Sequence, residues 1–335
     1  MPIPNLYSAP MPDSIESVTI DGITYILTAD EGDDKEYGAF EEKVKAKELF
    51  AGEVIEGVTP SNYNCSESSE AEAVCSGSLR LTVGSSAVNY DNPSAPVIEK
   101  IVTLGGRGIS ILKETNDKLE PFWNSGSELE EAVCTNFPWA FNSVQDEEFA
   151  SVNGVLYNTT DDDLRETITE VSDPEEDGCE DQGDGTPGAC PLSKTVDERS
   201  EKDGPAPEAI VVGKACGRLF AVTSSEKGGS AFLYDITNIS SPVLSKVFHL
   251  SPASENLSAG LAYDQRELGE VDAESIIFLD ASKSPRGKAA VLFAGAWSGT
   301  VSYWEFECSE DYFPKRTCNK YVESIIEFVS EIIGF

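Results

Sequence analysis

The chain has 335 residues, with 60 acidic and 24 basic side chains and a formal net charge of −36. Its hydrophobic fraction of 40% is enough to form a core. The charge excludes nucleic acid as a natural partner, because phosphate binding needs clustered Lys and Arg, and it disfavours an anionic membrane surface. Cations are the expected counter-charge, so the acidity indicates either a solvated surface suited to salty water, carboxylates that converge on Ca²⁺, or both.

Short β-rich runs separated by Gly, Pro and Asp follow one another along the chain. Residues 17–29 predict two strands joined at Asp21-Gly22, a strong hairpin signal, and residues 41–49 predict the one internal helix. Residues 321–335 carry apolar side chains at helical spacing, which predicts a terminal amphipathic helix packed on the body, with a peripheral anchor as the alternative. Further strands are predicted at residues 79–83, 97–104, 108–112, 209–212, 219–223, 231–236, 276–279, 289–294 and 300–306.

The strands show a loose repeat in which a turn of small residues leads into an alternating strand, at residues 106–112, 228–238 and 299–305. This pattern is typical of β-propeller blades, with a β-sandwich as the competing fold. We predict an all-β propeller over residues 1–310 with acidic loop insertions at 61–76 and 173–204, followed by a helical tail over 311–335. The chain starts without a basic or apolar leader, so we expect an incomplete propeller that lacks N-terminal blades. No apolar run is long enough to predict a transmembrane segment.

Eight cysteines are present, and three pairs of them are 10 or 11 residues apart: Cys65/Cys75, Cys179/Cys190 and Cys308/Cys318. Such spacing favours local disulfides formed in an oxidising compartment. A zinc site is disfavoured, because the ligand spacing is wrong and His249 is the one histidine. Four N-glycosylation sequons, at Asn64, Asn158, Asn238 and Asn256, support secretion weakly.

Carboxylates beside small residues at strand ends are the candidate site residues. Glu31, Glu208, Glu226 and Glu274 share this kind of position, and Asp33 belongs to the same acidic turn as Glu31. In a propeller such strand ends converge on the central channel, where the carboxylates would repel one another unless a cation or an arginine joined them. Arg107 and Arg199 are the candidate arginines. The alternative is a set of solvated turn acids with a structural Arg–Glu network.

Other motifs are weaker. Residues 173–184 place acids and a glycine in the order of an EF-hand loop, but with Pro174 and non-helical flanks, so a chance match is favoured. The chain has no GxSxG elbow, HExxH or P-loop. A serine–histidine–aspartate site could use only His249, and its apolar alternation indicates a half-buried strand residue instead.

Six segments together resemble one family, the extracellular choice-of-anchor I propeller domain found in mesenchyme-specific cell surface glycoprotein-like proteins, some bacterial members of which are labelled alkaline phosphatase-like. They occur in the family's order at residues 12–38, 104–112, 141–143, 197–210, 224–242 and 294–305. The resemblance implies that Glu31, Glu208 and Glu226 occupy the family's acidic turns. It also implies that Ala296 stands where the family has a glutamate, and that Ala209 replaces a glycine.

These observations lead to two hypotheses of function. The first is an extracellular or cell-surface module that binds Ca²⁺ or another divalent cation and an extracellular protein or carbohydrate partner, without catalysis. The second is a metal-dependent phosphoesterase, a calcium-dependent phosphoric ester hydrolase that uses the acidic channel; it rests on fold-level analogy. Whether the chain is an enzyme is left open by the sequence, and an inactive remnant is a third possibility.

Overall fold

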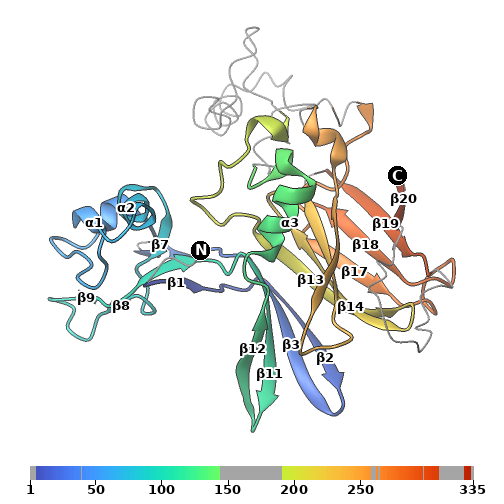
Figure 1. Cartoon of the computed structure of the whole chain (residues 1–335), viewed down its shortest axis with the longest axis horizontal. Coiled ribbons are helices and arrows are strands. Elements are labelled where there is room, and N and C mark those ends of the chain that lie inside the picture. The colour runs from blue at the N-terminus through green and yellow to red at the C-terminus, as the bar shows by residue number, and fades with distance from the viewer. Residues whose placement is uncertain are drawn as a thin grey trace.

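The protein is built from β-sheets (Figure 1). The computed structural model describes residues 5–38, 40–143, 191–257, 262, 265–296 and 298–308, and the backbone of residues 328–332. In this part of the chain, four sheets have four strands each, two ribbons have two strands each, and the three α-helices are short. The predicted all-β class is therefore confirmed.

Three of the four-stranded sheets make up the body. The first sheet has the order β12-β11-β3-β2, and the second and third sheets are sequential antiparallel meanders. The strands of the first sheet are β2 (Ser14–Ile20), β3 (Ile23–Asp30), β11 (Gly108–Thr115) and β12 (Lys118–Asn124). Those of the second are β13 (Pro207–Ala215), β14 (Arg218–Ser225), β15 (Ser230–Asp235) and β16 (Val243–His249). Those of the third are β17 (Ser275–Leu279), β18 (Ala290–Gly295), β19 (Thr300–Phe306) and β20 (Phe328–Ile332).

The hairpin predicted at Asp21-Gly22 joins β2 to β3. Ile20 pairs directly with Ile23, so the loop has two residues. Both have positive φ, 52° at Asp21 and 79° at Gly22, as a type I′ turn requires. This turn fixes the register of the hairpin, and the hairpin β2–β3 extends beside β11–β12 at the bottom of Figure 1.

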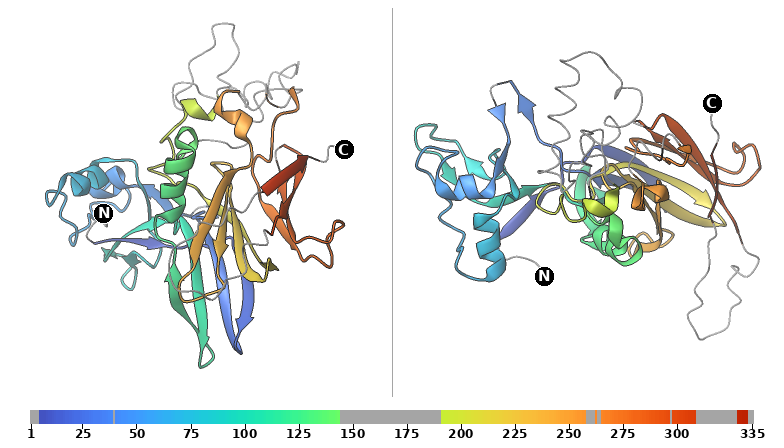
Figure 2. Two further views of the ribbon diagram at one scale, coloured as in Figure 1. Left: turned by 45° about the vertical axis from the view of Figure 1, so that its right-hand side comes forward. Right: turned by 90° about the horizontal axis from the view of Figure 1, so that it is seen from above.

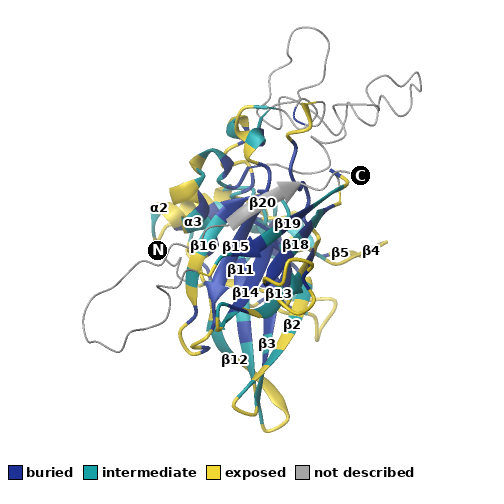
Figure 3. Ribbon diagram, turned by 90° about the vertical axis from the view of Figure 1, so that its right-hand side faces the viewer, coloured by how far each residue is buried: buried dark blue, intermediate teal, exposed yellow. Residues whose placement is uncertain are grey.

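The three sheets lie in series because their first strands adjoin: β13 contacts β2 and β3 on one side and β17 on the other. Side chains from both faces of the second sheet fill the two spaces between the sheets. Phe232 and Tyr234 pack with Leu27 and Ile111 of the first sheet, whereas Phe220 and Leu233 pack with residues of the third sheet. Strand β15 is consequently buried along its whole length, as the dark strands of Figure 3 show. Burial of these apolar side chains is the main stabilising contribution, at about 25 cal/mol per Å².

A fourth sheet builds a separate lobe that projects to one side of the body in Figures 1 and 2. Apart from β1, the strands of this sheet lie between β3 and β11 in the sequence. Its order is β1-β10-β7-β6, with β1 parallel to β10. Its own core includes Leu49, Val74, Leu81 and Ile98. The elements of the lobe are β1 (Leu6–Ala9), β4 (Glu36–Tyr37), β5 (Phe40–Glu41), β6 (Lys43–Lys45), α1 (Ala46–Ala51), α2 (Ser69–Ser76), β7 (Arg80–Thr82), β8 (Val88–Asn89), β9 (Val97–Ile98) and β10 (Ile101–Leu104). The predicted loop insertion at 61–76 is thus part of this folded lobe and contains helix α2.

The prediction of a helix at residues 41–49 is wrong for the residues that precede Ala46. Lys43–Lys45 form β6, because Val44 pairs with Leu81 and completes the edge of the lobe sheet. The helix α1 starts only at Ala46 and ends at Gly52, whose φ of 73° gives a left-handed C-cap. Helix α2 was not predicted. The hydroxyl of Ser68 caps it by accepting a hydrogen bond from the amide of Ala71.

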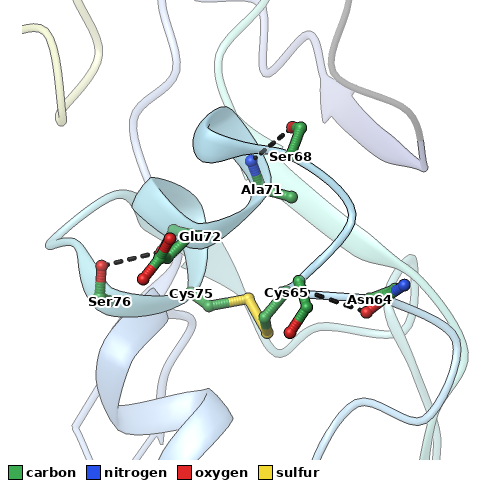
Figure 4. The surroundings of a disulfide bond; sticks show 8 residues. Asn64, Cys65, Ser68, Ala71, Glu72, Cys75 and Ser76 are labelled. Atoms are coloured by element: carbon green, nitrogen blue, oxygen red, sulfur yellow. Dashed lines mark hydrogen bonds between the residues drawn. A yellow bond between two sulfur atoms is a disulfide. The ribbon is translucent and has the colours of Figure 1, made fainter.

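Two disulfides are formed by the described cysteines. Cys65–Cys75, predicted from its spacing, ties α2 to the loop before it (Figure 4). The prediction of Cys308–Cys318 is wrong, because Cys308 bonds to Cys216 instead. Cys216 lies in the β13–β14 turn and Cys308 lies two residues after the end of β19, so this disulfide joins the second sheet to the third. Cys179, Cys190 and Cys318 lie outside the described residues, and exposed Cys134 forms no disulfide with a described cysteine.

The prediction of a C-terminal helix is also wrong for residues 328–332, the part of the tail that the structure describes. Phe328–Ile332 form β20, which pairs antiparallel with β19 from Ser302↔Ile332 to Phe306↔Phe328. The spacing of the apolar residues in this segment is compatible with a helix or with a strand. A strand forms because the edge of β19 offers backbone groups that need hydrogen-bond partners. The rest of the tail and the EF-hand-like residues 173–184 lie outside the described residues. No described helix has the length and apolar character that a membrane-spanning helix requires.

Secondary structure that the sequence patterns missed completes the body. Helix α3 (Glu128–Asn136) follows β12 and leads into the 3₁₀ turn η1 (Pro138–Ala140). Two more 3₁₀ turns, η3 (Leu192–Lys194) and η4 (Pro252–Glu255), contact each other. Leu129, Val133 and Leu192 bury their side chains in the core shared by the first and second sheets.

Candidate metal centre

The same backbone turn precedes the first strand of each of the three body sheets. Met11, Ala206 and Asp272 have φ values of 48°, 44° and 58°, in the left-handed region that side-chain-bearing residues rarely adopt. Two residues later each turn presents an acid where the first strand begins: Asp13 before β2, Glu208 at the start of β13 and Glu274 before β17. Three turns of one kind therefore place three acids at equivalent positions in adjacent sheets.

A second set of positions lies where the second strand of each sheet ends. Glu31 directly follows β3, Glu226 follows β14, and Ala296 follows β18. The amide of Glu226 donates to the carbonyl of Ala206 at 2.9 Å, and the amide of Ala296 donates to that of Asp272 at 2.9 Å. In the first sheet the amide of Gly32 donates to Met11 at 3.2 Å. These bonds hold the end of each second strand beside the turn that presents the acid of the first strand.

Three of the predicted carboxylates meet at this end of the body. Glu31, Glu208 and Glu226 each offer one oxygen, and these three oxygens lie within 4.8 Å of one another. All three side chains are half-buried. Carboxylate oxygens at such separations can share one divalent cation, because Ca²⁺ takes oxygen ligands at 2.3–2.6 Å.

The surroundings of the three glutamates raise their pKa values and so favour the protonated, uncharged form. Burial, followed by the charges of Glu208 and Glu226, raises the pKa of Glu31 to about 9. Burial, followed by the charges of Asp13 and Glu226, raises the pKa of Glu208 to about 8. Burial also raises the pKa of Glu226, although Lys227 opposes the shift by forming an ion pair with it. A bound cation would relieve this repulsion.

The remaining predicted acids lie at the rim. Asp33 and Glu274 are exposed, and each acts on the cluster through its charge: Asp33 contributes to the raised pKa of Glu31, and Glu274 to that of Glu208. Asp13 is exposed as well and hydrogen-bonds to Glu208. The structure thus brings together three of the predicted carboxylates and places the other two around them.

The two predicted arginines bind the segment at residues 199–204, which precedes Glu208 in the chain. Arg107 pairs with Glu130 at 2.7 Å and donates to the carbonyl of Ser200 at 3.0 Å. Gly204 has a φ of 64°, which favours glycine, and the absence of a Cβ leaves room for the Arg107 guanidinium, which would lie 2.5 Å from one. Arg199 forms an ion pair with Asp203. Burial alone would raise the pKa of Asp203, but the positive charges of Arg199 and Arg80 lower it. Both arginines therefore order the turn that leads to Glu208.

Asp13, Lys227 and Asp203 were missed by the sequence analysis. A signal for Asp13 was present, since Pro12-Asp13 and Pro207-Glu208 are the same proline–acid pair before a strand. Lys227 follows Glu226 directly, but a neighbouring opposite charge in the sequence does not predict an ion pair. Asp203 becomes relevant only through its contact with Arg199.

His249 lies at the end of β16 and is buried, with 4% of its surface exposed. Its ring is 4.5 Å from that of Trp139 and 5.8 Å from that of Phe137, measured between ring centroids. Its Nδ1 accepts a hydrogen bond from the amide of Ser251. Burial lowers the pKa of His249 to about 4, so the ring is neutral at physiological pH. The prediction of a strand residue is confirmed, but the side chain is buried rather than half-buried.

Comparison with known proteins agrees with the resemblance. The profile of the choice-of-anchor I domain matches residues 2–159 and 190–239. The chain belongs to the choice-of-anchor I family. The matched residues include Glu31, Asp33, Glu208 and Glu226, whereas Glu274 and Ala296 lie beyond them.

A curated relative supports the same family. The chain is 25% identical over 226 residues to Gigasin-3a of Magallana gigas. The alignment covers 67% of this chain and 64% of Gigasin-3a, so the chain spans less than two-thirds of the relative's length. No solved structure matches the chain.

Proposed function

We propose that this protein is an extracellular or cell-surface module of the β-propeller type that binds a divalent cation, Ca²⁺, through Glu31, Glu208 and Glu226. The observation that carries this proposal is the convergence of one oxygen from each of these carboxylates within 4.8 Å. They come from two adjacent sheets and from three separate strand ends, so the fold itself positions them. We assign the module no catalytic role.

The propeller arrangement is supported by the order of the sheets. The second and third sheets are four-stranded meanders whose first strands, β13 and β17, adjoin, and β2 of the first sheet adjoins β13 on its other side. Sheets that meet through their first strands and pack face to face are the building units of propellers. The repeated left-handed turns at Met11, Ala206 and Asp272 add to this, because one turn recurs at one place in each sheet.

Calcium is favoured over other divalent cations by the kind of ligand and its mobility. The cluster offers oxygens alone, which disfavours zinc. Half-buried glutamates allow the irregular coordination that Ca²⁺ accepts, whereas Mg²⁺ requires near-ideal octahedral geometry. Asp13, Asp33 and Glu274 add negative charge at the rim and would attract the cation. Lys227 competes with the cation for Glu226, so we expect moderate affinity, with a Kd of about 10⁻⁴–10⁻³ M as in extracellular modules.

The compartment is inferred from the disulfides and the family. Cys65–Cys75 and Cys216–Cys308 are formed in the described part of the chain, and disulfides persist in oxidising environments. Asn64, Asn238 and Asn256 are exposed, as glycosylation in a secretory pathway requires, and Asn158 lies outside the described residues.

Calcium titration of chelator-stripped protein tests the metal site. At ten times a Kd of 1 mM, binding would stabilise the fold by about 1.4 kcal/mol, which raises Tm by about 2 °C for a chain of 335 residues. Glu31→Gln combined with Glu208→Gln should abolish the rise, whereas Glu120→Gln, an exposed carboxylate on β12, should leave it unchanged. A melting temperature that is the same in Ca²⁺ and in chelator would overturn the proposal.

A further inference from the structure

A cavity of about 190 Å³ opens in the inserted lobe, away from the acidic cluster. Its wall is formed by β1, by the segment that precedes Cys65, and by the β9–β10 turn. The disulfide Cys65–Cys75 anchors this segment to α2 directly after the wall, as Figure 4 shows. The cavity is therefore a preformed feature of a crosslinked lobe.

The cavity differs in charge from the rest of the chain. Of the described residues that line it, only Glu99 and Lys100 are charged, and their charges cancel. Glu99 accepts a hydrogen bond from the Asn89 amide at 3.0 Å, and the Lys100 ammonium lies 5.8 Å from the centroid of the Tyr7 ring. In a chain with a net charge of −36, such a balanced pocket selects neither for cations nor for anions.

A buried hydroxyl in the wall lacks a partner. Tyr63 is only 8% exposed, and its hydroxyl makes no hydrogen bond within the described part of the chain. A buried polar group left unsatisfied costs about 1–3 kcal/mol. Because the Tyr63 hydroxyl has almost no accessible surface, a ligand must displace a neighbouring side chain to bond to it, and the bond would then recover this free energy. Burial, and then the charge of Glu67, raises the pKa of Tyr63, so the hydroxyl keeps its proton and can donate as well as accept.

The wall also combines an exposed aromatic ring with amide groups. Tyr7 is 52% exposed, so its ring is accessible to a ligand. The amide of Asn62 is held only by a long contact of 3.5 Å to the Glu99 carbonyl, which leaves it available. An aromatic surface with a few convergent polar groups is the usual composition of a small-molecule site.

We propose that this cavity binds a neutral hexose ring, the terminal sugar of a glycan. A pyranose has an apolar C–H face that packs on an aromatic ring such as Tyr7, and hydroxyls that both donate and accept, as Tyr63, Asn62 and the Glu99–Lys100 pair require. Pockets for drug-sized ligands measure about 300–1,000 Å³, so a cavity of this size fits a single ring. The site is separate from the metal centre and does not depend on the function proposed for it.

Saturation-transfer NMR on the full chain tests this site, with the methyl glycosides of D-glucose, D-galactose and D-mannose as probes at millimolar concentration. The buffer contains chelator, so that the metal centre does not contribute. We expect saturation transfer to the ring protons of at least one glycoside. Tyr7→Ala and Tyr63→Phe should each weaken its binding at least fivefold. Tyr37→Ala should not change it, because Tyr37 is a still more exposed tyrosine on β4, outside the cavity.

Three outcomes would overturn the proposal. The first is no transfer from any of the three glycosides, and the second is transfer that neither Tyr7→Ala nor Tyr63→Phe reduces. The third is displacement of the glycoside by free glycine or alanine, which would show that Glu99 and Lys100 bind a zwitterion. Tyr63→Phe without ligand should melt at or above the wild-type temperature, since the hydroxyl that it removes has no partner. A lower melting temperature would contradict the argument from this hydroxyl.

Discussion

The amide of Ala296 donates a 2.9 Å hydrogen bond to the carbonyl of Asp272, and this bond is the counterpart, in the third sheet, of the bond from Glu226 to Ala206 in the second. The two positions are equivalent in backbone geometry, since Ala206 and Asp272 both have positive φ. They differ in the side chain that they place at the end of the second strand. The three clustered glutamates therefore come only from the first and second sheets. The third sheet has Ala296, and no carboxylate, at the position that Glu226 occupies in the second.

Restoring a carboxylate at this position should strengthen the cation site. We expect Ala296→Glu to lower the Kd for Ca²⁺ about three- to tenfold, because an added carboxylate increases the charge of the ligand set. Without cation the variant should be less stable than the wild type, since it adds to the like-charge repulsion. Calorimetric titration measures the first effect and urea denaturation the second. Ala296→Gln, of the same size but uncharged, is the matched control, and equal calcium affinities in the two variants would refute the equivalence of the positions.

Calcium binding should depend on pH. The pKa of Glu31 is about 9 and that of Glu208 about 8, both above the ordinary value of 4.5, so protons compete with the cation at neutral pH. The Kd should fall more than tenfold between pH 6 and pH 9. Without cation, a higher pH should instead lower the free energy of unfolding. The raised pKa values of Glu31 and Glu208 contribute stability that is fully present below pH 4.5 and is lost as the pH rises through 8 to 9. Titrations at several pH values test this, and the Glu31→Gln, Glu208→Gln variant should show neither trend.

His249 should make the fold sensitive to acid. Its pKa is lowered from 6.5 to about 4, so its contribution to stability is complete above pH 6.5 and is lost as the pH falls toward 4. The full loss amounts to about 3 kcal/mol. His249→Asn keeps an acceptor for the Ser251 amide but does not titrate. The free energy of unfolding, measured with urea from pH 7 to pH 4, should fall less steeply in this variant. Parallel slopes would show that carboxylates alone determine the acid response.

The two disulfides should differ in their contribution to stability. Cys216–Cys308 closes a segment with a sequence separation of 92, and Cys65–Cys75 one with a separation of 10. Loop entropy predicts about 4.6 kcal/mol for the longer loop and about 2.7 kcal/mol for the shorter one. Replacing each pair by alanines and measuring denaturant unfolding should therefore show the larger loss for Cys216 and Cys308. An equal loss would mean that strain or residual structure in the unfolded chain dominates over loop length.

The sequence predicted the local features of this fold well. The Asp21-Gly22 turn requires two residues with positive φ, and this requirement is independent of the rest of the chain. The apolar and β-branched residues of β14, β15 and β19 likewise predict strands without reference to the rest of the chain. Glu31, Glu208 and Glu226 were found because acids beside small residues at strand ends form a visible pattern, and the structure brings their oxygens within 4.8 Å of one another.

Features that depend on distant residues could not be predicted in this way. Cys308 has Cys318 as its nearer neighbour in sequence, but the packing of the second sheet on the third places Cys216 beside it, with 5.4 Å between the Cα atoms. Asp13 joins the site only because β2 lies next to β13. Residues 328–332 could form a helix or a strand by their spacing, and the open edge of β19 determines that they form β20.

By itself, then, the sequence determined the strands, the tight turn and the acids that end the strands, because backbone conformation and side-chain alternation are set within a few residues. Only the tertiary structure decided which acids meet, which cysteines bond and where Ala296 interrupts the cluster. These properties follow from the order in which the sheets pack, and that order is set by the burial of side chains on both faces of the second sheet.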